Sequence, residues 1–504
     1  MLWIALHLPL LSLEAFAATL AHGQADAPLA LVDAHHVAAA NAAAQALGVE
    51  PGQKRATALA LAPDLLIGQA DATRDAAALA AVAHAALAFT PSVCVQPALE
   101  APRSADTVLL EVRASLRCFG GLAALLQRLR EAVTPLGHRV QAASAPTPLG
   151  AALLARGPRR MHVQERAALQ RALDALPPWL LGPGREHWEA LQGMGLATLA
   201  DLRRLPRAGL ARRFGTALLA ELDRAYGERP DPRVPITLPP RFDSRLELFA
   251  RADSAEQVLH ASSMLLARLA SWLAAQHAFV RGFRLAMLHE PRWRHDAQVP
   301  PQTVLEVALA EPSRDPAHLQ VLLRERLVQL RLPAPTLELR LSATEIVPGE
   351  APSGELFPSA ASEREGLVRL VERLQARLGA GQVQTLQPVH DHRPERASRL
   401  EPAQPARLGQ RRSAPDAPAV PLRPVWLLAP PEPLAVRGGQ PLLDGRALQL
   451  LSGPERIEAG WWDHELAERD YFIAEDAGGA LVWLYRSRLP GGEGSGWYLH
   501  GRFA

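Results

Sequence analysis

The sequence predicts a multidomain chain that joins an α/β layer to smaller α+β parts, and its length and patterning carry this prediction. The 504 residues are enough for roughly three or more domains, and a 48% hydrophobic content supplies several cores. Short apolar strands alternate with helices in the first third, helices fill the next part, and aromatic-rich, strand-like segments end the chain. Two cysteines, Cys94 and Cys118, cannot build a disulfide framework, which favours a reducing compartment.

The first sixteen residues are apolar and support two interpretations. A secretory signal begins with basic residues, but this segment has none, and His7, Pro9 and Glu14 interrupt its apolar run. Residues 15–17 could imitate a cleavage site, so an exported α/β protein stays an alternative. No later stretch approaches about 18 uninterrupted apolar residues, and a membrane span is not expected. We favour a buried strand.

The remaining elements follow from hydrophobic periodicity and turn residues. In the first 135 residues we expect strands at Leu2–Leu8, Leu29–Asp33 and Thr107–Val112, and helices at Val37–Leu47, Asp75–Ala88 and Leu122–Val133. Residues 167–226 are predicted to be all helical, with a proline-rich tether at 230–240. A small α+β domain follows, with helices at Ser254–Gln276 and His318–Val328 and strands at Phe279–Leu288, Val304–Ala310 and Thr336–Thr344. The last eighty residues are expected to be mostly β.

The charge is unevenly distributed along the chain. Residues 1–53 contain four acids and no Lys or Arg, whereas residues 156–251 carry 17 arginines against 11 acids. A basic middle region suits a polyanion such as nucleic acid, although a solvated helical surface explains the same charge equally well.

A glycine-rich motif lies inside the helical segment. Gly182 and Gly184 are followed by Arg185 and a helix, and a second helix opens after Gly195. The motif resembles the helix-hairpin-helix element of DNA polymerases and repair proteins. Glycines let the backbone approach a phosphate closely, and helix N-terminal N–H groups then point at it. The alternative is an ordinary glycine-rich helical turn.

The order of these segments resembles that of the Y-family (translesion) DNA polymerases over about residues 1–350. The resemblance implies a right-hand fold with a palm at 1–12 and 75–165, fingers at 13–74, a thumb at 166–240 and a little finger at 241–348. Beyond it we expect a loop at 349–362, an amphipathic helix and extension at 363–400, a flexible linker at 401–424 and a C-terminal partner-binding domain at 425–504.

The catalytic palm positions of that family are degenerate in this chain. The resemblance aligns His7 with the metal-binding Asp and Pro9 with the second acidic position, while Asp106 remains and Thr107 replaces the adjacent Glu. Phosphoryl transfer with two metal ions depends on carboxylates that hold Mg²⁺. Their loss predicts several kcal/mol less transition-state stabilisation.

The fingers lack the family's grip on the incoming triphosphate. Ala42 and Gln45 stand where a Tyr and an Arg bind it in the family. We therefore expect no catalytic residues, no metal, no cofactor and no polymerase activity. The rival interpretation is a weakly active translesion polymerase that uses Asp106, Glu111 and a third, unidentified ligand.

Four strings in the tail resemble a non-catalytic subset of this family, the polymerase-like subunits of bacterial damage-inducible mutagenesis cassettes. They are residues 391–395 (DHRPE), 456–463 (RIEAGWWD), 469–472 (RDYF) and 497–503 (WYLHGRF). The resemblance implies an adaptor for error-prone lesion bypass in the bacterial cytoplasm, at the nucleoid. Its implied partners are primer-template DNA, the β sliding clamp, a RecA-like accessory protein and a separate error-prone replicative-type polymerase.

The resemblance also implies particular contacts. A clamp-binding peptide is expected at Glu355, Leu356 and Phe357, with Ser353 in place of the usual leading Gln. Alternatively, this loop docks on its own domain. Phosphate contacts are expected from Gly182, Gly184, Arg185, Arg203, Arg204, Arg212 and Arg213.

The adjacent pair Trp461 and Trp462 permits three interpretations. The indoles could stack on exposed bases, form the core of the C-terminal domain, or anchor a protein partner.

Overall fold

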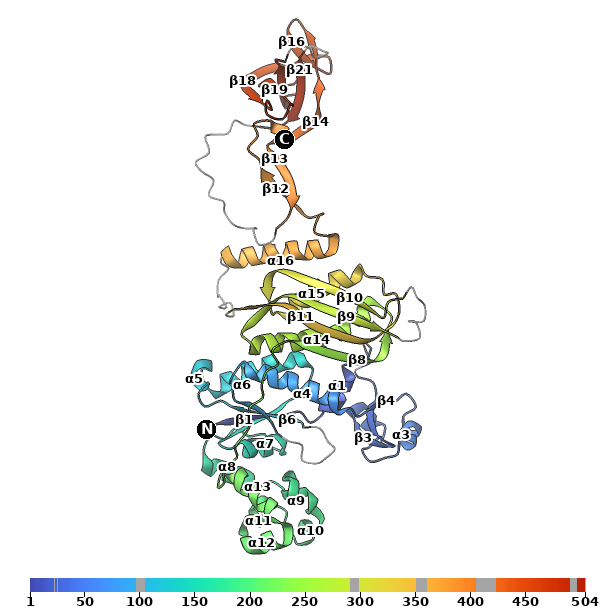
Figure 1. Cartoon of the computed structure of the whole chain (residues 1–504), viewed down its shortest axis with the longest axis vertical. Coiled ribbons are helices and arrows are strands. Elements are labelled where there is room, and N and C mark those ends of the chain that lie inside the picture. Colours follow the sequence, from blue (N-terminus) through green and yellow to red (C-terminus); the bar gives the residue numbers. More distant parts are fainter. Residues whose placement is uncertain are drawn as a thin grey trace. The chain divides into compact units, whose positions relative to one another are not determined.

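The computed structural model describes residues 1–21, 23–24, 26–96, 105–290, 299–349, 360–404, 423–489 and 496–503 (Figure 1). The chain forms two compact units, residues 1–359 and 360–504. The predicted clamp peptide at 355–357 and most of the predicted linker, 405–422, lie outside the described residues.

The palm is a four-stranded antiparallel sheet in the order β5-β6-β1-β7. The strands are β1 (Trp3–His7), β5 (Val93–Gln96), β6 (Thr107–Glu111) and β7 (Gln141–Ala145). Because β1 pairs on both edges and is covered on both faces, its residues are apolar up to His7. Ile4 and Leu6 face the helices α4 (Ala72–Leu87) and α6 (Leu122–Val133), whereas Trp3 and Ala5 face α7 (Pro148–Arg156).

The fingers correct one predicted element. Residues 37–47 were expected to form one helix, but they divide into β3 (His36–Ala40) and the short α2 (Ala42–Ala46). Asn41 sets the boundary, because its Oδ1 accepts from the amides of Ala44 and Leu29 at 2.9 and 3.0 Å. Because alanine occurs in both strands and helices, the Asn41 cap and the pairing of β3 with β2 determine where the strand ends and the helix begins. The other elements are α1 (Leu11–Ala17), β2 (Leu29–Asp33), α3 (Arg55–Leu61) and β4 (Leu66–Gln69), in a sheet ordered β3-β2-β4.

The thumb is all helical, as predicted. Its helices are α8 (Arg166–Asp174), α9 (Gly182–Glu186), α10 (Trp188–Gly193), α11 (Leu199–Arg204), α12 (Arg207–Phe214) and α13 (Thr216–Tyr226). Their buried leucines form one core with α7 and with the α7-facing side of the palm sheet. The thumb is therefore continuous with the palm.

The little finger repeats a strand–helix–strand unit twice. Its sheet has the order β10-β9-β11-β8 and packs against two helices. The elements are β8 (Asp243–Ala252), α14 (Ala255–Ala275), β9 (Ala278–His289), β10 (Gln302–Ser313), α15 (Pro316–Val328) and β11 (Thr336–Pro348). Among the described helices, α14 alone is long and apolar enough to span a membrane, but most of it is buried against this sheet and the palm, as in the core helix of a soluble domain.

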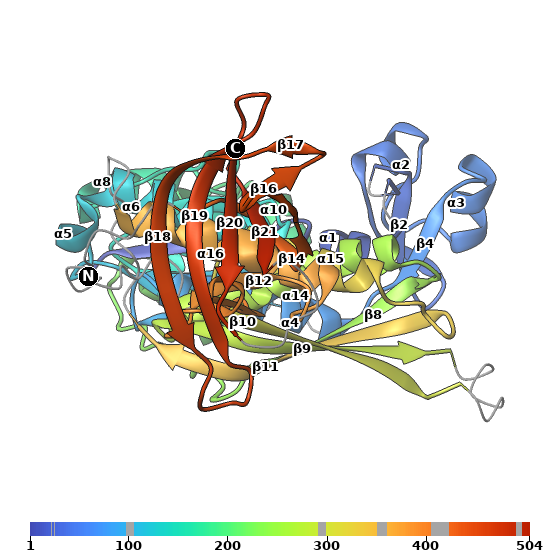
Figure 2. The ribbon, with the colours of Figure 1, turned by 90° about the horizontal axis from the view of Figure 1, so that it is seen from above.

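The second unit begins with α16 (Ala360–Leu378), three residues earlier than predicted. A two-stranded ribbon, β12 (Gln384–Pro388) with β13 (Ser398–Pro402), follows, so the start of the predicted linker is ordered strand. The end of the chain is mostly β, as predicted. Figure 2 shows strands of its five-stranded sheet, β14 (Trp426–Pro433), β21 (Trp497–Arg502), β20 (Leu481–Ser487), β19 (Ala467–Glu475) and β18 (Gln449–Ala459). A small sheet holds β15 (Ala435–Arg437), β16 (Gln440–Leu443) and β17 (Arg446–Ala447).

Candidate functional site

The degenerate palm positions gather at one end of β1. His7 is the last residue of β1 and lies opposite Thr107, the first residue of β6, with Asp106 immediately before it. The Thr107 hydroxyl donates to Asp106 Oδ1 at 2.7 Å, and His7 Nδ1 lies 3.2 Å from the same hydroxyl. Arg156, the last residue of α7, donates from Nη2 to Asp106 Oδ1 at 2.7 Å. Three of the four residues were predicted; Arg156 was not.

Hydrogen bonding fixes the state of this cluster. Because the Thr107 hydroxyl gives its single proton to Asp106, it can only accept from His7, so His7 Nδ1 carries a proton. Burial by itself raises the pKa of Asp106, but the hydrogen bond from His7 and the charge of Arg156 outweigh it and hold that pKa well below its usual range. The carboxylate is ionised at neutral pH and already has its counter-ion.

This donor set does not fit the Mg²⁺ ions that a polymerase palm implies. One carboxylate, one imidazole and one hydroxyl replace a set of carboxylates, and a guanidinium already occupies Oδ1 of Asp106. Pro9 is exposed in the turn after β1 and offers no side-chain ligand. Within the described ranges, no three His, Cys, Asp or Glu side chains come together in a way that could hold a metal ion.

Glu111 does not complete the site either. It ends β6, five residues after Asp106, which places it roughly 16 Å along an extended strand. Its Oε1 accepts from the amide of Leu2 at 2.9 Å. The structure thus separates the two acids on which the weakly active alternative relies.

The two predicted triphosphate positions lie exposed on α2. Gln45 turns its amide back and donates to the carbonyl of Ala40 at 3.0 Å. Ala42 offers only a methyl group. Neither residue brings positive charge, so this helix lacks the cation needed to hold a triphosphate.

In the thumb, the predicted glycine pair is engaged in packing. The amide of Gly182 donates to Glu221 Oε2 at 3.1 Å, and burial raises the pKa of that carboxyl group. A Cβ on Gly184 would lie 2.0 Å from the carbonyl oxygen of Pro178. Gly193, which ends α10, and Gly195, in the turn after it, are exposed, and an added Cβ would meet nothing at either; the same holds for Gly209 and Gly215 further along the thumb. The sequence signal for Gly193 and Gly195 is the tripeptide Gly-Met-Gly, which ends α10 and precedes α11 by a short loop.

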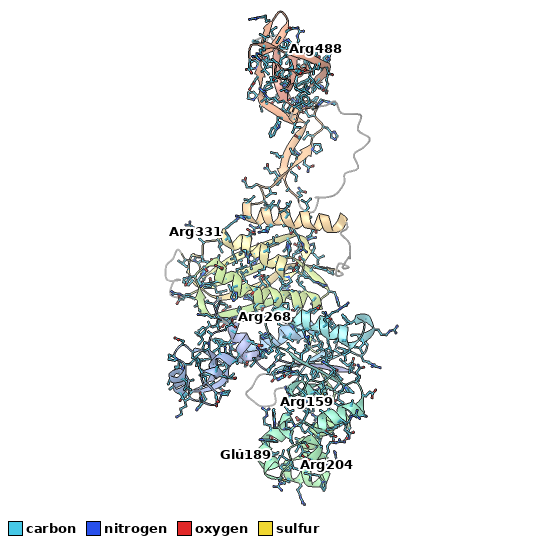
Figure 3. The ribbon with its side chains drawn as sticks, turned by 180° about the vertical axis from the view of Figure 1, so that it is seen from behind. Arg159, Glu189, Arg204, Arg268, Arg331 and Arg488 are labelled. Atoms are coloured by element: carbon cyan, nitrogen blue, oxygen red, sulfur yellow. The ribbon has the colours of Figure 1, made fainter. Side chains whose placement is uncertain are left out.

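The predicted thumb arginines differ in how their charge is used. Arg203 pairs with Asp174 at 3.2 Å and covers the ring of Tyr226 at 4.1 Å, so its charge is compensated locally. Arg185 covers the ring of Trp179. The exposed arginines of the set are Arg204, at the outer part of the thumb in Figure 3, and Arg212 and Arg213 on α12. Phosphate contact by any of them stays a prediction.

The little-finger sheet exposes arginines that face carboxylates on the same or neighbouring strands. Three such pairs are Arg245 with Glu338 at 3.1 Å, Arg284 with Glu306 at 2.6 Å, and Arg340 with Asp243 at 2.6 Å. Exposed pairs of this kind are worth little and are screened by salt. A phosphate backbone could therefore displace these carboxylates at small cost.

A second cluster lies in the C-terminal unit, where two of the four tail strings, 391–395 and 456–463, meet around Arg393. Its side chain is 2% exposed and donates to Asp391 at 2.6 and 3.0 Å, to Asp463 at 2.6 and 3.0 Å, and to the carbonyl of Glu465 at 3.1 Å. These bonds use all five guanidinium donors. A Cβ on Gly460 would lie 2.6 Å from Arg393 Nη1, and Gly460 has φ +85°, so the loop requires glycine there.

The same turn continues into a polar layer over the sheet. Arg469 pairs with Glu395 at 2.9 Å and donates to the Tyr471 hydroxyl at 3.0 Å, and that hydroxyl lies 2.8 Å from His500 Nδ1. Burial lowers the pKa of His500 to about 4. His500 comes from the last string, so all four strings belong to one connected network.

The network carries an exposed pair of indoles. Trp461 is 75% and Trp462 50% exposed, and their rings meet edge to face at 5.3 Å. The guanidinium of Arg393 lies 5.6 Å from the ring centre of Trp462. The core is built from other aromatic residues, among them Trp483 stacked on Tyr471 at 4.1 Å. The interpretation of Trp461 and Trp462 as core residues is therefore wrong.

Comparisons with known proteins agree with this architecture. Residues 12–156 match the model of the impB/mucB/samB family, IMS. The chain is 31% identical to Protein ImuB from Caulobacter vibrioides strain NA1000 / CB15N over 481 residues, which cover 91% of this chain and 100% of that protein, and the same figures hold for strain ATCC 19089 / CIP 103742 / CB 15. The chain belongs to the ImuB family.

Solved structures similar to this ImuB-family chain include three Y-family proteins. A crystal structure of DinB from Sulfolobus solfataricus is 16% identical with a TM-score of 0.37. A ternary complex of Dbh and a Dbh–Dpo4 polymerase chimera are each 17% identical, with TM-scores of 0.38 and 0.39. Each match covers 69% of this chain and 100% of the other. The predicted family is confirmed by the ImuB relatives and the family model, and the multidomain α/β and α+β architecture is confirmed by the structure itself.

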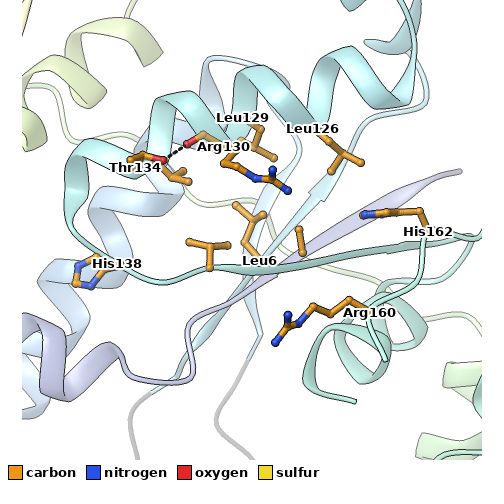
Figure 4. A pocket seen from close by; sticks show the side chains of 11 residues that line it. Leu6, Leu126, Leu129, Arg130, Thr134, His138, Arg160 and His162 are labelled. Atoms are coloured by element: carbon orange, nitrogen blue, oxygen red, sulfur yellow. Dashed lines mark hydrogen bonds between the residues drawn. The ribbon is translucent and has the colours of Figure 1, made fainter. Parts of the chain in front are cut away.

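The ImuB-family palm also has a cavity of about 360 Å³ on its other face (Figure 4). Leu6 lines it, and Leu6 points away from the His7 side of the sheet because successive strand side chains alternate. The lining residues are Leu6, Leu126, Leu129, Arg130, Val133, Thr134, His138, Val140, Ala142, Arg160 and His162. They include no carboxylate, so this cavity is separate in place and in chemistry from the degenerate site.

Proposed function

We propose that this ImuB-family chain is a non-catalytic, polymerase-like adaptor in damage-induced, error-prone lesion bypass. The observation that carries the proposal is Asp106, which is paired with Arg156 and hydrogen-bonded to Thr107 where a polymerase palm needs several carboxylates for Mg²⁺. The name of the curated relatives and the match to the impB/mucB/samB family support a role in a mutagenesis cassette.

DNA would be held by the thumb and the little finger rather than by the palm. The exposed arginines of α12 and the turn at Gly193 and Gly195 support backbone contacts, which position a duplex without reading its sequence. Fluorescence anisotropy on a primer-template tests this. Arg212→Glu with Arg213→Glu should weaken binding at least tenfold and reduce the salt dependence, whereas Arg203→Gln, whose charge is already paired, should weaken it less.

Recruitment is the other half of the proposed function. The peptide Glu355, Leu356 and Phe357 would dock on the sliding clamp, and the exposed pair Trp461 and Trp462 would anchor a cassette partner, either the RecA-like accessory protein or the error-prone polymerase. We place the protein in the bacterial cytoplasm, at the nucleoid. A clamp pull-down with the Leu356→Ala, Phe357→Ala variant tests the first contact. Equal recovery of the variant and the native chain would remove that peptide from the proposal.

A protein partner suits the indole pair better than DNA bases do. Arg393, which lies over Trp462, and its neighbour Arg396 both pair with Asp463. The charges of these two arginines are therefore already compensated, whereas proteins that stack on single-stranded DNA combine the rings with a positively charged groove.

A further inference from the structure

Arg156 is buried to an unusual degree for an arginine. Its side chain is 4% exposed, and within the described residues its ion pair is with Asp106. Only Nη2 is used in that contact; Nε and Nη1 are buried and have no hydrogen-bond partner. A buried guanidinium is tolerated only with a compensating negative charge. The charge of Asp106, with a weaker contribution from Glu221, therefore compensates Arg156 in place of a full set of hydrogen bonds.

The fold delivers Arg156 to this position. The hydroxyl of Thr147 caps the start of α7, accepting from Gly150 at 3.1 Å, and donates to the carbonyl of Ala225 in the thumb at 2.7 Å. At the other end, a Cβ on Gly157 would lie 2.9 Å from Cδ2 of Leu176 and 3.2 Å from the carbonyl oxygen of Leu153, so the end of the helix is closely packed there. Both ends of α7 are fixed by packing, and its last side chain points at the end of β1.

Two donors converge on a single oxygen of Asp106, and the ring of His7 lies beside them. Nη2 of Arg156 and the hydroxyl of Thr107 are each 2.7 Å from Oδ1, and Nδ1 of His7 is 3.4 Å away. A divalent ion bound to that oxygen would sit roughly 2.0–2.6 Å from it and would meet the guanidinium at once. The two cations therefore exclude each other from Oδ1 of Asp106.

We infer that Arg156 is the resident counter-ion of this palm, a guanidinium that takes the charge-compensating place of a divalent metal. The inference rests on the proposed non-catalytic function and adds a second barrier to metal binding. Restoring the carboxylates alone, with His7→Asp and Thr107→Glu, does not recreate a metal site while Arg156 remains. Removing Arg156 from that restored palm does.

Binding of Mn²⁺ to the full chain, measured by electron paramagnetic resonance of the free ion, tests the inference without any activity assay. Three forms are compared: the restored palm (His7→Asp, Thr107→Glu), the restored palm with Arg156→Gln, and the restored palm with Arg159→Gln. Arg159 is the matched control, because it is exposed three residues away on the same segment (Figure 3). Adding Asp106→Asn to each form identifies the part of the binding that belongs to the palm.

We expect Arg156→Gln to tighten palm-dependent Mn²⁺ binding at least tenfold and Arg159→Gln to change it less than twofold. Equal affinity in the restored palm with and without Arg156 would overturn the inference, as would an equal gain from Arg159→Gln. If Arg156→Gln unfolds the restored palm, Arg156→Lys is used in its place. Lysine keeps the positive charge, so a gain of Mn²⁺ affinity in that variant would also contradict the inference. Primer extension by the native chain would refute the proposed function while leaving this binding comparison intact.

Discussion

Two buried arginines with opposite hydrogen bonding mark the two units of this ImuB-family protein. Arg393 in the C-terminal unit satisfies all five donors on two carboxylates and a carbonyl, whereas Arg156 in the palm satisfies one donor and leaves Nε and Nη1 without a partner. A fully satisfied network rigidifies the segments that it joins. Arg156, by contrast, compensates a charge without completing its hydrogen bonds. Arg393 therefore has a structural role, and Arg156 compensates the charge of Asp106.

The largest effect is expected at Arg393. Arg393→Ala leaves Asp391 and Asp463 without their shared cation, and we expect the melting temperature of the C-terminal unit to fall by about 10 °C. Differential scanning calorimetry of the full chain measures it. Arg399→Ala, which removes an exposed arginine paired with Glu401 on the same strand, is the control and should shift melting by about 2 °C or less. Equal shifts of the melting temperature in the two variants would mean that Arg393 contributes no more to stability than an exposed arginine does.

Substitution of Arg156 should destabilise the protein less than substitution of Arg393, and its effect should be strongly coupled to that of Asp106. Because Asp106 is partly exposed, we expect Arg156→Gln and Asp106→Asn each to lower the free energy of unfolding by about 2 kcal/mol. The double variant should cost at least about 1 kcal/mol less than the sum, since neither group is then left alone. Urea denaturation of the four forms gives the cycle. Strict additivity would mean that the two residues are not partners.

The C-terminal network should also respond to pH. The pKa of His500 falls from 6.5 to about 4 on folding, so the neutral ring is favoured in the folded state. The corresponding stability is complete above pH 6.5 and is lost as the pH falls from 6.5 toward 4. We expect His500→Gln to flatten the stability profile in that window, in urea denaturation at several pH values. An unchanged slope would mean that other groups carry the acid sensitivity.

The smallest effect on stability is expected at the exposed indoles. Trp461→Ser should change the free energy of unfolding by no more than about 0.5 kcal/mol, because the ring is 75% exposed. Trp483→Ala, in the stacked core, should cost about 3–5 kcal/mol. If Trp461→Ser destabilises the unit as strongly as the core substitution, the pair serves the fold and is no free anchor for a partner.

Local pattern was enough for most of the fold. The buried strand at Leu2–Leu8, the helix Leu122–Val133, and both helices and three of the four strands of the little finger follow from periodicity alone, and each lies within a few residues of its predicted place. The edge strand β8 of the little finger was not predicted. In the fingers the predicted helix was wrong at His36–Ala40. Alanine occurs in strands and in helices, and here the pairing with β2 makes the segment a strand.

The sites likewise have some features that the sequence predicts and others that only the folded chain shows. The absence of carboxylates at His7 and Thr107 is visible in the sequence, but the replacement of their cation by Arg156 depends on a contact across fifty residues that no local pattern reports. The tail strings were recognisable one by one. Their meeting around Arg393 and His500 depends on the turn at 391–396, the loop at 460–465 and the packing of β19 against its neighbours, which only the folded chain brings together.

Single-nucleotide primer extension decides whether this palm catalyses. The purified full chain is given a primer-template and each dNTP with Mg²⁺ or Mn²⁺, and is compared with its own Asp106→Ala variant. We predict no incorporation by the native chain above the level of that variant with either metal. Incorporation that disappears on Asp106→Ala would contradict the non-catalytic adaptor and establish a weak translesion polymerase.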